Sequence, residues 1–422
     1  MNSQASSRAR LSTLDLVCSV MDSRPSPLDF TVVLHLTGTP GLEALRAGAR
    51  SARNRYPTTG SYIDKDRWVR CDELTDGVKV AAPINGVGAT NLIRAIEEFI
   101  DGPFDLRKQM PVQQLVIING SGKPMTLVTR FHHAVADGLS AAMWLGHQLQ
   151  VAYGHERAVT EASPFQDLSL RTLPSPVKKS RFAYDGPSDR LWTSCASRSG
   201  ARRWLTIKIA ATDLRERCRR RGGFTYNDLL ATCTLEILSR WNRMHGVDRG
   251  QKIGLWLPVN IRQRSSVGFG NGTSRIRLYA RYAGATSLVD KCREIRRQVS
   301  WSNRHGEWVV PPVNALARLP RWAIRPFLRC YLNRPSVDMA TGVFSHAERW
   351  TEGNSEVFQH VEKIECIGLL HSRQCLAVNG VTHQGWTWLT FTYDPGLLFA
   401  EDIQQLAEMY QERIALAQRE LA

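Results

Sequence analysis

The feature that most constrains the fold is a segment, residues 170–203, in which the apolar periodicity of the chain stops. It is rich in proline, serine and arginine, a composition typical of a linker between folded units. The chain has 422 residues, which is long for one hydrophobic core and ordinary for two. The sequence therefore predicts an N-terminal lobe over residues 1–169, an inter-lobe linker over 170–203 and a C-terminal lobe over 204–422.

The composition is that of a folded globular protein, with 43% hydrophobic and 22% charged residues. No run approaches the roughly 20 apolar residues that a membrane span needs, and the polar, basic first residues lack the apolar centre of a secretory signal. The nine cysteines are scattered and form no Cys-x-x-Cys pair, so neither a zinc knuckle nor a disulfide framework is indicated. We therefore expect a reducing, cytoplasmic compartment.

The formal net charge is +16, and arginine far outnumbers lysine. A solvated basic surface in an arginine-rich chain accounts for such a charge. The charge also suits an anionic partner, namely an acidic carrier protein, the phosphates of coenzyme A or an anionic membrane. Nucleic acid is not expected, because the chain has no C2H2 spacing, no RRM-like aromatic motif and no basic stretch interleaved with aromatics.

The first lobe alternates between strand-like and helix-like segments. Runs rich in Val, Ile, Leu and Thr predict strands, and stretches bounded by capping residues, Gly or Pro predict helices. Two of the apolar runs are joined by a turn-rich connection, which predicts a hairpin. The expected strands are 29–37, 61–70, 78–82, 112–118 and 125–131, and the expected helices are 12–22, 41–56, 90–100 and 138–153.

The second lobe also alternates between strand-like and helix-like segments. Gly222 and Gly223 separate two helices, and Thr225 is the expected N-cap of the second. The picture is of two α/β lobes of similar size. The other expected elements are strands at 204–209, 252–258, 275–281, 374–380 and 386–393, and helices at 287–304 and 400–420.

The sharpest feature of the sequence is the segment 131–138, Phe-His-His-Ala-Val-Ala-Asp-Gly, which leaves an apolar strand and enters a helix. Neighbouring residues at the end of a strand point in opposite directions, so we expect one of His132 and His133 to face a cleft while the other packs inward. A neutral imidazole is suited to accept a proton at neutral pH. Asp137 is expected to orient the loop or to pair with an arginine, and Gly138 to let the chain pass tightly into the helix.

Two other interpretations of this segment are weaker. A metal site is not expected, because the two histidines point apart and no third ligand at zinc spacing lies nearby. A purely structural role would leave two satisfied histidines beside a helix cap. The chain also has no Gly-x-Ser-x-Gly nucleophile elbow and no P-loop. A histidine base without a covalent enzyme intermediate fits the residues that are present.

Residues 132–138 resemble the HHxxxDG motif of the coenzyme A-dependent acyltransferase superfamily. Its members include nonribosomal peptide condensation domains, polyketide-associated acyltransferases, bacterial wax ester synthases, plant acyltransferases and chloramphenicol acetyltransferase. Three weaker matches lie in the right order along the chain, one before this motif and two after it, so the resemblance covers most of the chain. The plant-type DFGWG motif is absent, which argues against that branch. The weaker matches are a PFDL segment at 103–106, an Asn-Asp helix start at 225–228, and a VNxR … GN stretch at 258–262 and 269–271.

The resemblance implies an α/β fold of two chloramphenicol-acetyltransferase-like lobes, which form a pseudo-dimer with a central substrate tunnel. It also implies that His133 is the catalytic base and that Asp137 forms a structural salt bridge with Arg262. The remaining residues would support the loop, as expected for His132 and Gly138, or shape the tunnel, as expected for Asn260 and Asn271.

The implied activity is transfer of an acyl group from a thioester, either acyl-coenzyme A or an acyl carrier protein, to a hydroxyl or an amine. The thioester would be a substrate, and neither a tightly bound cofactor nor a metal is expected. The product would be a lipid or small-molecule ester, or an ester or amide made from carrier-bound intermediates of specialised metabolism. The VNxR … GN stretch favours the second. A different class stays open, in which a catalytically idle, condensation-like protein docks a carrier protein as a scaffold.

A further feature is the segment 316–334, in which arginines alternate with Trp, Ile, Phe and Leu and prolines interrupt the pattern. One interpretation is a helix that packs on the C-terminal lobe. The other is a cationic interfacial segment that makes a peripheral contact with a membrane or lines the access path of a long acyl chain.

Overall fold

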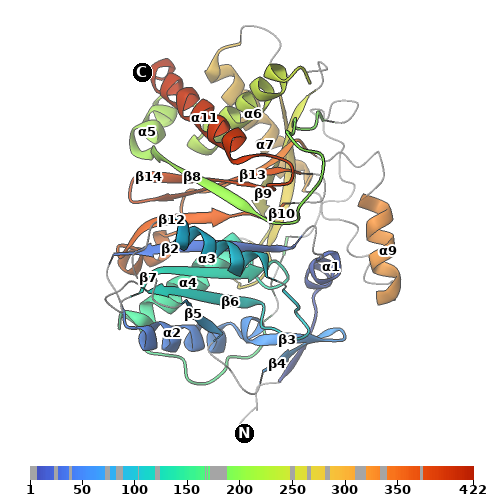
Figure 1. Ribbon diagram of the computed structural model, residues 1–422, viewed down its shortest axis with the longest axis vertical. Helices are drawn as coiled ribbons and strands as arrows, with labels where there is room; N and C mark the ends of the chain where they lie inside the picture. Colours follow the sequence, from blue (N-terminus) through green and yellow to red (C-terminus); the bar gives the residue numbers. More distant parts are fainter. Residues whose placement is uncertain are drawn as a thin grey trace.

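Two large β-sheets, each with its own hydrophobic core, dominate the computed structural model (Figure 1). A small third sheet joins β1 (Arg8–Arg10), β4 (Arg67–Arg70) and β3 (Ser61–Asp64). The structure describes residues 7–22, 27–37, 40–71, 77–81, 89–102, 104–118, 124–166, 168, 170–171, 188–247, 252–263, 268–280, 286–308, 320–332, 340–370 and 374–422.

The first large sheet has five strands and is buried on both faces. Its central strands therefore read as nearly continuous apolar runs rather than as an alternating pattern. Along β7, Leu127 and Phe131 face one core cluster, and Val128 faces another on the opposite side. The strand order is β12 (Val361–Ile367), β2 (Asp29–Leu36), β7 (Pro124–His132), β6 (Val112–Ile118) and β5 (Val78–Ala81).

Helices cover both faces of this sheet. On one face, α2 (Leu42–Arg55) and α4 (Gly138–Ala152) pack together and contribute Leu45 and Trp144 to the core. On the other face, α3 (Ala89–Asp101) packs through Ile96 and Ile100. The position of α4 matters for the site, because this helix starts at the end of the central strand β7.

The second large sheet has six strands, and four helices of the second half of the chain pack on it. Its core gathers apolar residues from β8, β9, β10, β13 and β14 with those of four helices. The helices are α5 (Ala211–Arg221), α6 (Tyr226–Met244), α7 (Leu288–His305) and α11 (Ala400–Glu420). The strand order is β10 (Thr273–Ala280), β9 (Ile253–Asn260), β11 (Gly342–Ala347), β13 (Leu376–His383), β14 (Trp386–Tyr393) and β8 (Arg203–Ala210).

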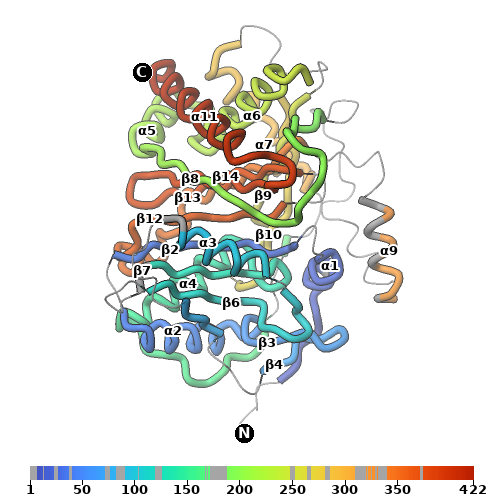
Figure 2. Tube along the Cα trace, viewed as in Figure 1, coloured from blue at the N-terminus to red at the C-terminus, as the bar shows by residue number. Residues whose placement is uncertain are grey.

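One strand of the second half of the sequence belongs to the first sheet. Figure 2 shows the late strand β12 beside the early strand β2, and the two pair in antiparallel register. A hydrogen bond between Glu365 Oε2 and His35 Nε2, 2.8 Å apart, joins the same two strands. On its other side β12 approaches β14, where the Gly368 amide that follows the strand donates to Thr392 Oγ1 at 2.9 Å. The two sheets are thereby fastened to each other through β12.

The described part of the expected linker is packed against both halves of the molecule. Leu191 is buried in the core of the second sheet, and the Ser199 hydroxyl donates to Asp394 at 2.6 Å. A few residues later, Arg202 reaches the first sheet and donates to the backbone oxygen of Asp29 at 2.7 Å. Residues 172–187 of the expected linker lie outside the described part of the chain.

Helix α9 (Arg321–Leu332) covers the described part of the segment 316–334. It packs on α1 (Thr13–Met21), where Ile324 and Val17 are buried together, so the expectation that this segment packs on the C-terminal lobe is wrong. Trp322 is 79% exposed on this helix. Across the residues that the structure describes, no helix is both long and apolar enough to cross a bilayer.

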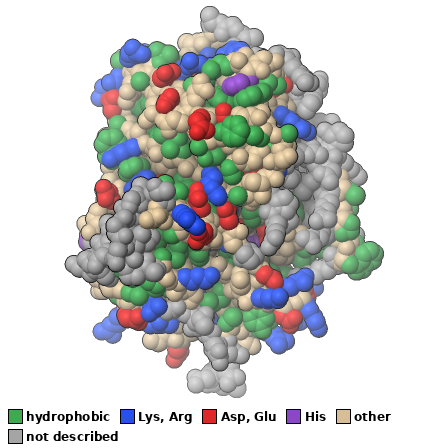
Figure 3. Space-filling view, in the orientation of Figure 1, with side chains coloured by type: hydrophobic (Ala, Val, Ile, Leu, Met, Phe, Trp, Pro, Cys, Tyr) green, Lys and Arg blue, Asp and Glu red, His purple; other side chains and the backbone are tan. Residues whose placement is uncertain are grey.

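Charged side chains of both signs are interspersed over the face of the molecule seen in Figure 3. Several ion pairs of the described residues are local to one helix, such as Arg219 with Glu216 on α5 and Arg46 with Glu43 on α2. The high net charge is thus spread over the surface on this side rather than collected in one patch.

Candidate active site

The turn between β7 and α4 carries the His-His-x-x-x-Asp-Gly segment. His132 is the last residue of β7 and pairs with Asp29 of β2. The chain then turns, and the Val135 amide donates to the His132 carbonyl at 3.0 Å. Asp137 caps α4, because its carboxylate accepts the Ser140 amide at 3.0 Å. The strand end and the helix start therefore fix both ends of the five-residue turn.

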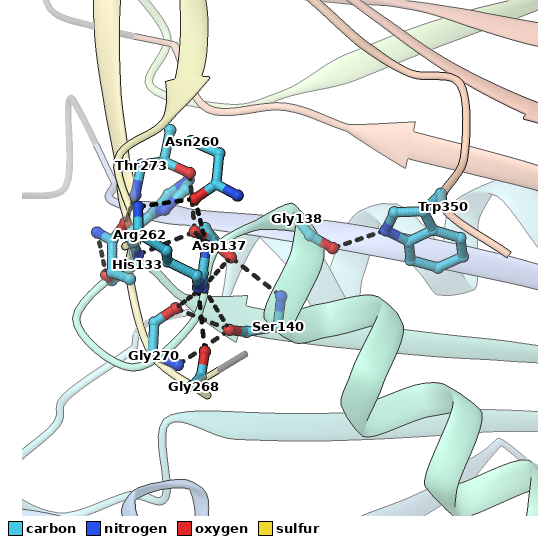
Figure 4. Close-up of polar contacts among 12 residues, drawn as sticks. His133, Asp137, Gly138, Ser140, Asn260, Arg262, Gly268, Gly270, Thr273 and Trp350 are labelled. Carbon is cyan, nitrogen blue, oxygen red and sulfur yellow. Dashed lines mark hydrogen bonds and ion pairs between the residues drawn. The ribbon is translucent and has the colours of Figure 1, made fainter. Parts of the chain in front are cut away.

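Asp137 and Arg262 form a buried bidentate ion pair, as the resemblance implied. The Arg262 guanidinium donates from Nη1 to Asp137 Oδ2 at 2.7 Å and from Nη2 to Oδ1 at 2.9 Å (Figure 4). The two side chains are 3% and 1% exposed. The Gly272 amide and the Thr273 hydroxyl also donate to the carboxylate, at 2.9 and 2.8 Å. Such a buried pair is stable only when its remaining donors and acceptors are satisfied, as they are here.

Electrostatics keep Asp137 charged. Burial alone would raise the pKa of Asp137, but the hydrogen bond and positive charge of Arg262, together with bonds from Ser140 and Thr273, hold that pKa below its ordinary value. A charged Asp137 pins the loop that follows β9 to the start of α4, so residues 125 positions apart in the sequence form one unit.

Arg262 is held by more than Asp137. Its Nε donates to the Gly268 carbonyl at 3.0 Å, and Nη2 donates to the Gly270 carbonyl at 2.6 Å. The Asn260 amide oxygen accepts from the Arg262 backbone at 3.0 Å and more weakly from Nη1 at 3.3 Å. The loop that follows Arg262 therefore folds back around its guanidinium.

Glycine at 272 is required by this arrangement. A Cβ atom at Gly272 would lie 2.6 Å from Arg262 Cγ and 2.7 Å from Nη1, closer than packed atoms approach. Gly270 has φ of 145°, a conformation that side chains disfavour. At Gly138, by contrast, a Cβ atom would meet nothing within 4 Å. The expected tight passage at Gly138 is thus not a steric requirement of this structure.

We expect Gly272→Ala to lower the free energy of unfolding by about 1–3 kcal/mol, the usual effect of overpacking. Gly138→Ala is the matched control, because its methyl group enters open space, and we expect it to leave stability unchanged or slightly raised. Urea unfolding of the two variants checks both. Equal destabilisation by the two substitutions would contradict the steric role assigned to Gly272.

His133 lies at the turn and is half-buried. Its backbone is fixed on both sides, since its amide donates to the Leu28 carbonyl at 2.8 Å and its carbonyl accepts from Asn271 Nδ2 at 2.7 Å. The ring packs against Phe30, with centroids 4.7 Å apart. The backbone contacts and the ring packing together hold the imidazole in place.

The surroundings favour the neutral form of His133. Burial lowers the pKa of His133 to about 4, more strongly than the charges of Asp137 and Asp29 and a hydrogen bond to the Ala136 backbone raise it, and the neighbouring His132 lowers it further. A neutral ring has a nitrogen lone pair that can accept a proton throughout the physiological pH range.

His132 is fully buried, so it is the histidine that packs inward. Its Nδ1 accepts the Ala134 amide at 3.0 Å, and its Nε2 lies 3.6 Å from a carboxylate oxygen of Asp22. Phe104 packs edge-on against the ring, with centroids 5.6 Å apart. Through these contacts, His132 holds the turn in place.

A buried charge cluster supports the end of β7. Asp29 is fully buried and accepts from Arg130 Nε at 2.6 Å and from Arg202 Nη2 at 2.7 Å. Burial would raise the pKa of Asp29, but the charges of Arg202 and Arg130 hold it below its ordinary value. Because Asp29 pairs with His132, this cluster ties the site to the chain segment that enters the second sheet.

The two asparagines expected at the tunnel are near the site and serve internal contacts. Asn271 is 8% exposed and divides its amide between the His133 carbonyl and Cys18 Sγ, the latter at 3.6 Å. Asn260, at the end of β9, is exposed and supports Arg262. Their place in the wall of a tunnel stays a prediction.

Several residues of the site had not been predicted from the sequence. The Ser140 hydroxyl bridges Arg262 and Gly270, and the Trp350 indole donates to the Gly138 carbonyl at 2.6 Å. Ser140, three residues after a capping Asp, could have been found from helix-capping preferences. Trp350 has no such local signal, because its contact joins α4 to the segment between β11 and β12. Within the residues that the structure describes, no group of three or more His, Cys, Asp or Glu side chains could hold a metal ion.

No protein-family profile and no curated protein matches the sequence. Solved structures nevertheless match nearly its whole length. The cyclization-docking bidomain of the EpoB nonribosomal peptide synthetase of Sorangium cellulosum covers 98% of this chain and 85% of its own, with a TM-score of 0.67 and 11% identity. The trichothecene 15-O-acetyltransferase of Fusarium sporotrichioides matches over 97% of this chain and 95% of its own, with a TM-score of 0.66 and 13% identity.

A third similar structure is polyketide synthase associated protein 5 of Mycobacterium tuberculosis, which covers 97% of this chain and 98% of its own, with a TM-score of 0.63 and 13% identity. The chain therefore has the two-lobed α/β fold of condensation domains and of acyltransferases related to them, and the predicted fold class is confirmed. At these identities the likeness establishes the fold, while the activity has to be argued from the site.

Proposed function

We propose that the protein is an acyltransferase that moves an acyl group from a thioester to a hydroxyl or an amine, with His133 as the general base. The observation that carries this proposal is the placement of His133, which lies half-buried in the turn with its backbone held on both sides. Burial lowers the pKa of His133, which favours the neutral imidazole that a general base needs. The Asp137 carboxylate and the Arg262 guanidinium beside it are occupied by hydrogen bonds to each other and to neighbouring groups. We therefore assign this pair to holding the turn rather than to proton transfer.

The reaction balances with this single residue. The acceptor gives its proton to the His133 imidazole while its oxygen or nitrogen attacks the thioester carbonyl carbon. The tetrahedral intermediate then collapses, the carbon–sulfur bond breaks, and the thiolate takes the proton from the imidazolium. The protein is left unchanged, so no covalent enzyme intermediate is needed.

The donor is proposed to be acyl-coenzyme A or the phosphopantetheine arm of an acyl carrier protein, and the two substrates to enter a tunnel between the lobes. The similar structures include the cyclization-docking bidomain of a nonribosomal peptide synthetase and a trichothecene 15-O-acetyltransferase, which supports a place in specialised metabolism, with lipid synthesis as the other proposed setting. Holding both substrates in one tunnel would add to the rate by removing the entropy cost of their encounter.

Release of free thiol tests the proposal. The intact protein is incubated with a panel of acyl-coenzyme A donors, with and without pooled alcohols and amines, and then with acylated carrier proteins. Acceptor-dependent release from either donor class supports acyl transfer. If no donor is discharged although a carrier protein binds tightly, the protein is a docking scaffold and the proposal is wrong.

The pH dependence of the reaction follows from His133. Because its pKa in the folded protein is lowered to about 4, we expect kcat/KM to stay constant as the pH falls from 7.5 to 5.5 and to decline only near pH 4. A histidine with its ordinary pKa would instead lose most of its activity between pH 7 and 5.5. Initial rates in buffers of constant ionic strength distinguish the two, and an acid limb centred near 6.5 would contradict the neutral, desolvated base.

A further inference from the structure

A shallow, solvent-open cavity lined by arginines lies on the surface of the second lobe, away from the β7–α4 turn in the sequence. It is formed along α7 and has a volume of about 430 Å³. Helix α7 belongs to the upper lobe in Figure 1. Four arginines and a single aspartate line the cavity, together with an aromatic ring: Arg293, Arg296, Arg297, Arg304, Asp290 and Trp301.

The amphipathic pattern of α7 places these arginines on one side. Leu288, Cys292, Ile295 and Val299, spaced by four, three and four residues, are buried in the core of the second sheet. The arginines occupy the opposite side of the helix. The other wall is the turn between α5 and α6, where Gly223 has φ of 81° and a Cβ atom would lie 3.2 Å from Arg293 Nε. A glycine there lets the turn approach the arginines closely.

The positive charge of the cavity is only partly neutralised. Arg297 pairs with Glu294 at 2.7 Å, and Arg296 lies 3.8 Å from Asp228. Arg293 and Arg304 contact backbone carbonyls, those of Arg221 at 3.5 Å and Ser300 at 3.2 Å, and within the described part of the chain neither makes an ion pair. Like charges gathered in a concave surface repel one another, and an anion bound among them would relieve that repulsion.

We propose that this cavity is a binding site for a phosphate ester. Guanidinium groups offer paired N–H donors that match phosphate oxygens, and several of them suit a ligand with more than one negative charge. The volume lies within the range of small-molecule sites, roughly 300–1,000 Å³. The ring of Trp301 stacks on the ring of His305, with centroids 3.7 Å apart. It gives the same cavity an apolar wall for the organic part of the ligand.

The ligand chemistry has two sources. One is the nucleotide end of a coenzyme A thioester, which would make the cavity part of the donor site and rests on the proposed function. The other is a free nucleotide that binds independently of catalysis. The two share a phosphate group on a nucleoside, and they differ in whether the pantetheine arm adds to the affinity.

Isothermal titration calorimetry on the intact protein tests the site with coenzyme A, 3′-dephospho-coenzyme A, ADP and inorganic pyrophosphate as probes. The variant removes the two arginines without ion pairs, Arg293→Gln with Arg304→Gln. Its matched control is Arg219→Gln with Arg220→Gln, which removes the same charge from exposed positions on α5 outside the cavity. Far-ultraviolet circular dichroism checks that both fold.

We expect at least one phosphate probe to bind the wild type and the control equally, and to bind the cavity variant at least about tenfold more weakly, since each lost charge-assisted bond weakens binding. Tighter binding of 3′-dephospho-coenzyme A than of ADP, from which it differs by the pantetheine arm, assigns the site to the thioester donor, and binding no tighter than that of ADP assigns it to a free nucleotide. Absence of binding by every probe, or an equal loss in the control, overturns the proposal. The measurement needs no turnover, so its outcome is separate from that of the proposed acyl transfer.

Discussion

Replacing His133 by alanine is expected to lower the rate of acyl transfer by about 100- to 10,000-fold, the usual contribution of a general base. The substitution removes the ring that accepts the proton and keeps the two backbone hydrogen bonds that fix the turn, to Leu28 and Asn271. The fold should therefore persist. Single-turnover release of thiol, measured beside thermal unfolding of the same preparation, separates loss of chemistry from loss of structure.

The adjacent histidine provides the control. His132→Ala removes a fully buried ring and the acceptor of the Ala134 amide, so its main effect should be on stability. Any loss of activity should then follow the fraction of unfolded protein. Full activity of His133→Ala, or an unfolded His133→Ala protein, would count against the assignment of the base.

The site illustrates which parts of a structure a sequence can predict. Strand geometry predicted that one of the two histidines would pack inward, and in the structure His132 is fully buried while His133 is half-buried. Which of the two would serve as the base came only from the family resemblance. The pairing of Asp137 with Arg262 came only from the family resemblance, since nothing in the local pattern joins residues 125 positions apart. The roles of Gly272 and Thr273 were not predicted, because they depend on where the Arg262 side chain and the Asp137 carboxylate lie in space.

The fold shows the same division. The C-terminal helix was predicted with its bounds, 400–420, because capping and periodicity are local properties. The run 61–70, expected to be strand-like, is a hairpin of β3 and β4 that turns at Lys65, whose φ is 53°. Strand β12 was not predicted. Its partners are β2, more than 300 residues earlier, and β14, so its burial is decided by tertiary packing rather than by its own sequence.

Arg262→Met should give the largest loss of stability. The substitution leaves the Asp137 carboxylate buried without its counter-charge, a change that typically costs about 3–5 kcal/mol. The loop at 268–272 also loses the guanidinium that its carbonyls surround. Urea unfolding monitored by tryptophan fluorescence measures the effect. Arg220→Met removes an exposed arginine of α5 and should change stability little, because surface ion pairs contribute little.

The pH dependence of that loss identifies its cause. In the wild type Arg262 keeps the pKa of Asp137 below its ordinary 3.8, so this carboxylate stabilises the fold above that pH, and the contribution is lost as the pH falls through the folded-state pKa. Without Arg262, burial dominates and raises the pKa, so the buried group takes up a proton and the deficit shrinks as the pH falls from 7 toward 4. Adding Asp137→Asn to Arg262→Met should likewise recover part of the lost stability at pH 7, because it removes the unpaired charge. A deficit that is independent of pH, and additive in the double variant, would mean that Arg262 acts through packing alone.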